Sequence, residues 1–222
     1  MSPSKPAFSE LSVLSTLAMK GVLDAVASGL RVQFHATQAL LKAIADGESA
    51  DVVLLTDEGI AQLAQQGKLV RASEIKLGAS GVGLAVRAGA PKPDISSLDA
   101  LKKTLLAAQS VAHSRMGASG IYFAGLLERL GLAERLKKRV IVEKGPVAAV
   151  VASGGAEIGA QLLCELAPVP GIDIVGPLPA EVQNFSHFSA ALMRDGKEAR
   201  AFLEFLRSPR VRDEMRKNFV QP

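Results

Sequence analysis

Short β-rich runs alternate with helical patterns along most of this chain. From Leu11, three strand-like runs are each followed by a segment whose apolar residues recur at helical spacing. Strands connected through helices pair in parallel, and the right-handed crossover packs each helix onto a face of the sheet. The pattern therefore predicts an α/β fold. The predicted strands are residues 11–16, 30–35 and 50–57, and the predicted helices that follow them are residues 17–27, 37–47 and 59–66.

A second α/β set follows a long strand-like segment at residues 75–89. The last strand-like run, residues 187–195, precedes two C-terminal helices that are separated at Pro209. If this strand and these helices return to the first half, the chain forms two lobes joined by two crossings. The predicted domains are lobe 1, residues 1–80 plus 177–222, and lobe 2, residues 81–176.

The composition fits a packed α/β core and excludes several classes of partner. Of the 222 residues, 48% are hydrophobic but only 4% are aromatic, so the core is expected to consist of Ala, Leu, Val and Ile. The net charge is a modest +4, and the basic run at 134–139 lacks the flanking aromatic residues that stack nucleic-acid bases. We expect no nucleic-acid partner. We also expect no membrane insertion, because no apolar run reaches the length of a membrane span.

The N-terminal segment and the single cysteine bear on the cellular compartment. Residues 1–10 are polar and carry no signal-peptide pattern, so the sequence as written predicts a cytoplasmic protein. A processed form would instead be periplasmic. Cys164 excludes an internal disulfide, and its apolar surroundings QLLCELAPV predict a small buried side chain rather than a nucleophile.

Small and hydroxyl residues stand where predicted strands give way to helices. Ser15 and Thr16 precede the first helix, Thr37 precedes the second, and Ser119 and Gly120 open the helix after the QSVAHS strand. The first turn of a helix has unpartnered N–H groups that, with the helix dipole, favour an anion. Ligands of open α/β sheets lie at the carboxyl ends of the strands. We therefore expect these residues to bind a small oxyanion or carboxylate between the lobes, although each hydroxyl alone also fits a structural N-cap.

Other residues are weaker candidates for ligand binding or catalysis. His35 and His113 end the strands before two of these helix starts, although a lone histidine in such a place is often a packing residue. Glu143 and Lys144 end another strand and fit either a ligand contact or a solvated ion pair. No spacing of His, Cys, Asp and Glu matches a metal site, and the phosphate loop and the dinucleotide fingerprint are both missing. We therefore expect no metal and no cofactor.

Taken in order, five segments resemble the molybdate-binding, type II periplasmic binding proteins of transport systems, in a divergent branch. The most specific pieces are ADGESADVV followed by Thr56 and Asp57, and SGIY at 119–122. The resemblance implies a two-lobed α/β fold, with each lobe a mixed or parallel sheet flanked by helices, and with two hinge crossings. The five segments are VLSTLAMKGVLDAVA, ALLKAIADGESADVVLLTD, ASGIYFAGLLERLGL, VASGGAEIGAQ and FLEFLRSPRVRDEMRKNF.

The resemblance also implies a set of binding residues. The family's two oxyanion-binding hydroxyls fall on Thr16 and Thr37, and its backbone donor in the second lobe falls on Ser119. A further backbone contact falls near Lys144 or Gly145. These positions coincide with the helix starts already identified, so the family's site supports a small anion as the ligand.

One family contact is missing, and this affects the expected ligand. The family's tyrosine hydroxyl falls on Leu162, while Gln161 beside it offers an amide suited to a planar carboxylate. An organic carboxylate is therefore expected in place of molybdate.

Two functions stay open. One is a solute-binding protein that closes over the anion without chemistry, with an ABC transporter permease as partner if the chain is exported. The other is an isomerase of an unsaturated polycarboxylate, because relatives of this branch include an aconitate isomerase. In that case His113 or His35 is the candidate base, and the N–H groups of Ser119 and Gly120 are the donors.

Overall fold

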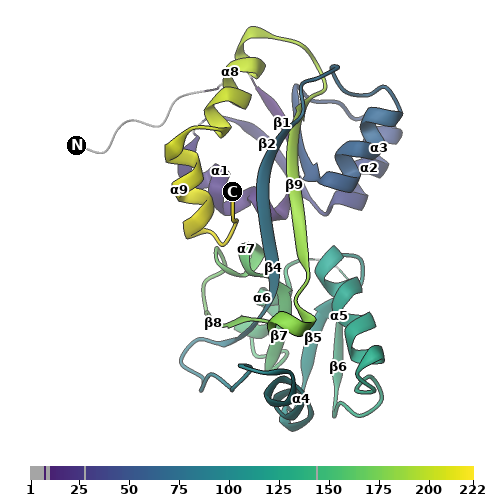
Figure 1. Ribbon diagram of the computed structural model, residues 1–222, viewed down its shortest axis with the longest axis vertical. Coiled ribbons are helices and arrows are strands. Elements are labelled where there is room, and N and C mark those ends of the chain that lie inside the picture. Colours follow the sequence, from purple (N-terminus) through teal and green to yellow (C-terminus); the bar gives the residue numbers. More distant parts are fainter. Residues whose placement is uncertain (1–7, 9–10, 28, 144) are drawn as a thin grey trace, which may run out of the picture. The chain divides into compact units, whose positions relative to one another are not determined.

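The computed structural model describes residue 8 and residues 11–222 apart from 28 and 144. Contacts divide the chain into two compact units, unit 1 (residues 1–79 and 187–222) and unit 2 (residues 80–186). The chain passes between the units within β4 (Ile75–Arg87) and again within β9 (Phe185–Leu192) (Figure 1). The return to unit 1 comes later than the expected residue 177, because β8 (Ile172–Pro177) pairs with β4 and so belongs to unit 2.

Unit 1 is built around a mixed sheet in the order β2-β1-β3-β9. Strand β1 pairs in parallel with β2 and β3, and β9 runs antiparallel to β3. Helices α2 and α3 cover one face of this sheet, while α1, α8 and α9 lie on the other side (Figure 1). The elements are β1 (Ser12–Thr16), η1 (Leu17–Met19), α1 (Lys20–Val26), β2 (Arg31–His35), α2 (Thr37–Ala45), β3 (Val52–Thr56), α3 (Asp57–Gln65), α8 (Lys197–Leu206) and α9 (Pro209–Lys217).

The burial of β3 explains its sequence. Residues Val52 to Leu55 are all fully buried, because helices cover both faces of this strand. The run VVLL therefore has no alternation of polar and apolar residues.

Ser208 separates the two C-terminal helices as predicted, since its Oγ accepts a hydrogen bond from Val211 N at 3.4 Å and Pro209 begins α9.

Unit 2 contains the sheet order β4-β7-β5-β6, with β8 on the other side of β4. Strand β5 is parallel to β6 and β7, and β4 is antiparallel to β7 and β8. Helix α6 packs against Ala112 of β5, whereas α5 lies over the next residue, His113, whose side chain points to the opposite face. The elements are α4 (Leu98–Ala107), β5 (Val111–Ser114), α5 (Ala118–Arg129), β6 (Arg139–Val142), α6 (Val147–Ala152), β7 (Ile158–Leu162), α7 (Leu163–Leu166) and η2 (Ala180–Val182).

Each unit is thus a mixed sheet flanked by helices, as the sequence predicts. The carboxyl ends of β1, β2 and β3 lie at one edge of the sheet in unit 1, and those of β5, β6 and β7 lie at one edge in unit 2, because the strands within each set are parallel. Within the described part of the chain, no helix has both the length and the apolar character that a bilayer crossing requires.

Candidate functional site

The end of β1 places two hydroxyl groups at the carboxyl edge of unit 1. Ser15 is fully buried, and its Oγ donates to the Thr16 carbonyl at 3.0 Å. Thr16 is 4% exposed, and its hydroxyl has no hydrogen-bond partner among the described residues. The expectation that Thr16 caps an α-helix is wrong, because a 3-10 turn, η1, separates it from α1. Of these two hydroxyls, that of Thr16 is the one available to a ligand.

Thr37 lies at the start of α2, but it is not the N-cap. Ala36 takes that position, and its carbonyl accepts the first helical hydrogen bond, from Leu40 N at 3.1 Å. A Cβ on Gly59 would lie 2.8 Å from the Thr37 methyl, so this side of Thr37 packs closely against α3. The Thr37 hydroxyl has no partner among the described residues, and His35, at the end of β2, is exposed.

The start of α5 explains the small residues between 117 and 120. Gly117 is the N-cap, and the first helical bond runs from Ile121 N to the Gly117 carbonyl at 3.0 Å. Ser119 and Gly120 are therefore first-turn residues, not N-caps, and their N–H groups have no partner inside the helix. A Cβ on Gly120 would lie 2.0 Å from the Ser114 carbonyl oxygen, so only glycine lets α5 start this close to the end of β5.

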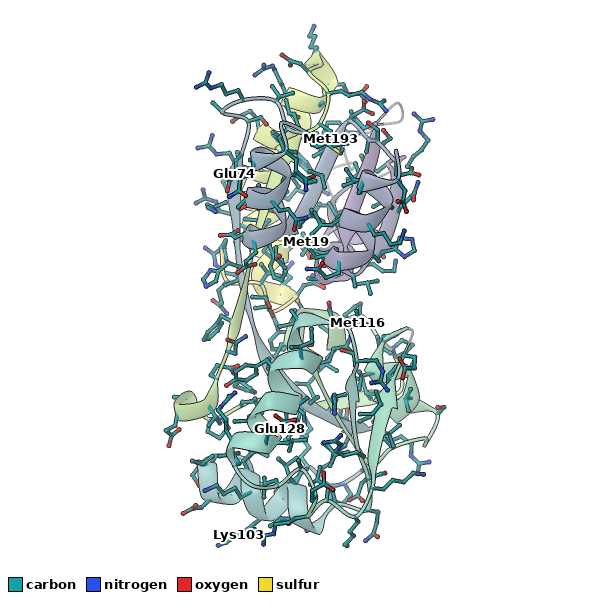
Figure 2. The ribbon with its side chains drawn as sticks, turned by 90° about the vertical axis from the view of Figure 1, so that its right-hand side faces the viewer. Met19, Glu74, Lys103, Met116, Glu128 and Met193 are labelled. Atoms are coloured by element: carbon teal, nitrogen blue, oxygen red, sulfur yellow. The ribbon has the colours of Figure 1, made fainter. Side chains whose placement is uncertain are left out.

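The start of α5 carries exposed apolar side chains. Met116, just before α5, is 58% exposed. Figure 2 shows Met116 beside the N-terminal end of the helix and Glu128 near its other end. Ile121, in the first turn of α5, is 57% exposed, so two large apolar side chains lie exposed near the first-turn N–H groups.

His113, in β5, is buried under α5. It is 3% exposed, and its ring centroid lies 6.0 Å from that of Phe123. Its Nδ1 donates to the Ser114 carbonyl at 3.1 Å; because a carbonyl only accepts, Nδ1 carries the proton and Nε2 of the neutral ring carries the lone pair. Among the described residues, this Nε2 is the one buried polar side-chain atom without a partner. Burial lowers the pKa of His113, Arg139 and Arg115 lower it further, and the bond to Ser114 opposes these effects.

Gln161 is engaged at both ends of its amide. Its Oε1 accepts a hydrogen bond from Ala148 N, in the first turn of α6, at 3.2 Å, and its Nε2 donates to Glu165 Oε2 at 2.7 Å. Gln161 is 4% exposed, and Leu162, which replaces the family's tyrosine, is equally buried at 4%. Gln161 therefore links α6 to α7 at the carboxyl edge of unit 2.

The other candidates differ in their surroundings. Cys164 is fully buried, as expected, and burial raises the pKa of its thiol strongly. Glu143 forms an exposed ion pair with Arg115, whose Nε lies 2.6 and 2.8 Å from the two carboxylate oxygens. Lys144, a predicted ligand contact, lies outside the described residues.

The structure thus brings the predicted residues together within each unit. Ser15, Thr16 and Thr37 share the carboxyl edge of unit 1, and His113, Ser119, Gly120 and Gln161 share that of unit 2. Sequence reasoning missed Glu165, although one sign was visible: it is the one acidic residue in the apolar run QLLCELAPV. No group of three or more His, Cys, Asp or Glu side chains suited to a metal ion occurs among the residues described.

Comparison of the sequence with known proteins gives two matches. Residues 21–220 match the family described as bacterial extracellular solute-binding proteins. An aconitate isomerase from Pseudomonas sp. is 39% identical over 216 residues, a match that covers 89% of this chain and 82% of that protein.

Comparison with solved structures identifies the fold. The periplasmic molybdate-binding protein of Azotobacter vinelandii superposes with a TM-score of 0.77 at 20% identity, covering 96% of this chain and all of that one. A sulfate-binding protein of Mycobacterium tuberculosis gives a TM-score of 0.67 at 16% identity, covering 96% of this chain and 86% of that one. At such identities the likeness concerns the fold alone. It confirms the expected α/β periplasmic binding protein fold.

Proposed function

The chain belongs to the bacterial extracellular solute-binding proteins, and we propose that it binds a small organic polycarboxylate and isomerises it by moving a proton. The observation that carries this proposal is the 39% identity to an aconitate isomerase over most of both chains. The class of substrate is an unsaturated tricarboxylate such as aconitate.

Backbone N–H groups supply the anion contacts in this proposal. Those of Ser119 and Gly120 are free of helical partners, and the dipole of the twelve-residue helix α5 favours negative charge at this end. In unit 1, the hydroxyls of Thr16 and Thr37 have no partner among the described residues and are the candidate donors to an anion there. Leu162, where the resemblance places a tyrosine, has no hydroxyl to donate to a tetrahedral oxyanion, which favours a carboxylate as the ligand.

The reaction needs a proton-transfer group and donors that stabilise developing charge. Removal of a proton next to a double bond places negative charge on the substrate, and positioned N–H donors stabilise such an enolate-like charge. The same first-turn N–H groups of α5 serve this purpose. Of the two histidines predicted as the base, His113 has an unprotonated ring nitrogen, as a base requires. His35, at the end of β2, has an exposed ring.

A second candidate is a solute-binding protein that captures the same ligand without changing it. The family description favours this function. Such a protein works outside the cytoplasm and delivers its ligand to an ABC transporter permease, so it requires export of the chain.

One experiment separates the two candidates. The protein is incubated with trans-aconitate in deuterated water, and proton NMR follows both the appearance of the cis isomer and deuterium incorporation at the substrate's carbon atoms. The isomerase proposal predicts both signals. Tricarballylate, the saturated analogue, serves as the control because it lacks the double bond and should bind without exchange. Binding of aconitate with neither isomerisation nor exchange would leave the solute-binding function.

A further inference from the structure

Glu165 is held in a fixed position at the carboxyl edge of unit 2. It lies in the first turn of α7, directly after β7. Its Oε2 accepts the 2.7 Å hydrogen bond from Gln161 Nε2, while Gln161 Oε1 accepts that from Ala148 N. Because Gln161 is nearly fully buried and engaged at both ends, its amide cannot rotate without losing a bond. The Glu165 carboxyl group is therefore oriented by α6 through this side chain.

The charge of Glu165 has no counterion among the described residues. None of the ion pairs of unit 2 includes it, and its Oε1 has no hydrogen-bond partner there. Burial raises the pKa of Glu165, and the hydrogen bond from Gln161 lowers it only in part. A glutamine at this position would accept the same hydrogen bond without the cost of desolvating a charge. The fold alone therefore gives no reason for a carboxyl group at this position.

The elements packed against α7 leave Glu165 without another titratable contact. Strand β7 and helix α6 carry no ionisable side chain. Strand β4, whose Ser80 Oγ accepts a hydrogen bond from Cys164 N at 3.2 Å, carries Arg87 at its end and Lys76, which is paired with Asp57 and Glu74. Strand β8 carries Asp173, whose Oδ2 accepts instead from Gly89 N at 2.8 Å. The neighbouring Cys164 is fully buried and has its pKa raised. Among the described residues of these elements, Glu165 is the group that can exchange a proton with a ligand.

His113 is less suited to this task than its free nitrogen suggests. Its Nε2 is enclosed between β5 and α5, and a substrate would reach it only if α5 moved away from the strand. The contact between Gly120 and Ser114 fixes the helix start close to β5 at this point. Glu165 lies in the short helix α7 and keeps part of its surface exposed, and among the described residues no contact like that between Gly120 and Ser114 covers it.

Resting on the proposed isomerase function, we propose that Glu165 removes and returns the proton during isomerisation, and that Gln161 is the residue that positions it. As a carboxylate, Glu165 takes a proton from the CH₂ carbon of the unsaturated tricarboxylate, so that a C–H bond breaks and an O–H bond forms. The electron pair moves into the allylic system and is stabilised as an enolate. Return of the proton to the other end of that system breaks the O–H bond, forms a new C–H bond and shifts the double bond.

The test is the variant Glu165→Gln. It keeps the size of the side chain and the acceptor for Gln161 but cannot take up a proton. The isomerisation rate should fall about 10²- to 10⁴-fold, while calorimetry should show nearly unchanged binding of aconitate. The matched control is Glu157→Gln, because Glu157 stands just before the other end of β7, where it accepts from Gln109 N at 2.6 Å. This control should keep wild-type activity.

The possible outcomes separate this assignment from the proposed function. Full activity of Glu165→Gln in a protein that isomerises aconitate would overturn the assignment alone. A wild-type protein that binds aconitate but never isomerises it would overturn the function and the assignment together. If Glu165→Gln does not fold, Glu165→Asp decides: its shorter side chain should reduce the rate, and a wild-type rate would contradict the proposal.

The pH profile tests the positioning role of Gln161. The rate should fall as the pH drops through the pKa of Glu165, because the base must be unprotonated. Gln161→Met removes the hydrogen bond that lowers this pKa, so the midpoint of the acid limb should move to higher pH. An unchanged midpoint in a folded, active Gln161→Met variant would contradict the role given to Gln161.

Discussion

A single carboxylate, that of Asp57, holds several elements of unit 1 together at the residue scale. Its Oδ1 accepts from the buried Ser189 Oγ at 2.6 Å, and its Oδ2 accepts from Lys76 Nζ at 2.8 Å. Burial alone would raise the pKa of Asp57, but these hydrogen bonds and the charge of Lys76 outweigh it and hold the pKa below its ordinary value of 3.8. Asp57 thus connects the start of α3 with β9 and β4.

Asp57→Asn should destabilise the protein in a pH-dependent way. A lowered pKa in the folded state stabilises the fold above the unfolded pKa, and this contribution is lost as the pH falls through the folded value. Near neutral pH the variant should lose about 1 to 3 kcal/mol of unfolding free energy. The difference from wild type should shrink as the pH falls below the ordinary carboxyl range. Urea unfolding at a series of pH values measures it.

The control for this prediction is Asp99→Asn. The Asp99 side chain is 86% exposed and lies 3.9 Å from Lys102, so only about 0.3 to 1 kcal/mol, from its place in the first turn of α4, should be lost. A loss in Asp57→Asn that stays constant down to acid pH would show that shape, and not charge, is what Asp57 contributes.

At the scale of elements, the position of α5 depends on residue 120 being a glycine, which has no Cβ. The helix begins where its backbone touches the end of β5, and the donors proposed for the anion lie in this same turn. Gly125, further along α5, has space around it: a Cβ there would meet only the flexible end of Arg129, at 3.4 Å. The two glycines of one helix therefore allow a matched comparison.

Gly120→Ala should destabilise unit 2 by about 1 to 3 kcal/mol, because the added methyl forces α5 and β5 apart. It should also weaken ligand binding, since the first-turn N–H groups move with the helix. Gly125→Ala should instead stabilise the protein by about 0.5 to 1 kcal/mol, because alanine restricts the unfolded chain and favours helix. Chemical unfolding and calorimetry measure both effects, and equal behaviour of the two variants would contradict this account of α5.

At the scale of the whole molecule, the candidate donors identified among the described residues are neutral N–H and hydroxyl groups. Arg115, a cation at the carboxyl edge of unit 2, is paired with Glu143. A ligand with several carboxylates gains from many such donors. The stability of the chain in the presence of different anions therefore reports the class of ligand.

Thermal unfolding with a panel of anions should separate carboxylates from tetrahedral oxyanions. A ligand at one hundred times its dissociation constant adds about 2.7 kcal/mol to the unfolding free energy. We expect cis- and trans-aconitate and tricarballylate to raise the melting temperature, and molybdate, tungstate and sulfate to leave it nearly unchanged. Stabilisation by tetrahedral oxyanions alone would rule out both the carboxylate ligand and the isomerase.

Much of the fold follows from local pattern. The predicted first three strands agree with β1, β2 and β3 within two residues at each end, because each is a compact β-rich run before a helix. The break at Pro209 is also local, since proline cannot continue a preceding helix. The helix caps were less predictable. Thr16 precedes a 3-10 turn instead of an α-helix, and Thr37 is the first residue of α2 instead of its N-cap. Both differences arise because the first turn after a strand adjusts to packing against its neighbours.

By itself, the sequence determined the alternation of strands and helices, and hence an α/β chain with helix starts at the carboxyl ends of its strands. It also determined that α5 begins with residues small enough to leave its N–H groups open. Only the tertiary structure decided that β8 pairs with β4, that His113 lies beneath Phe123, and that Gln161 joins Ala148 to Glu165. The physical reason is range: strand and helix patterns are set by neighbouring residues, whereas these contacts join segments whose meeting depends on the packing of the complete sheet.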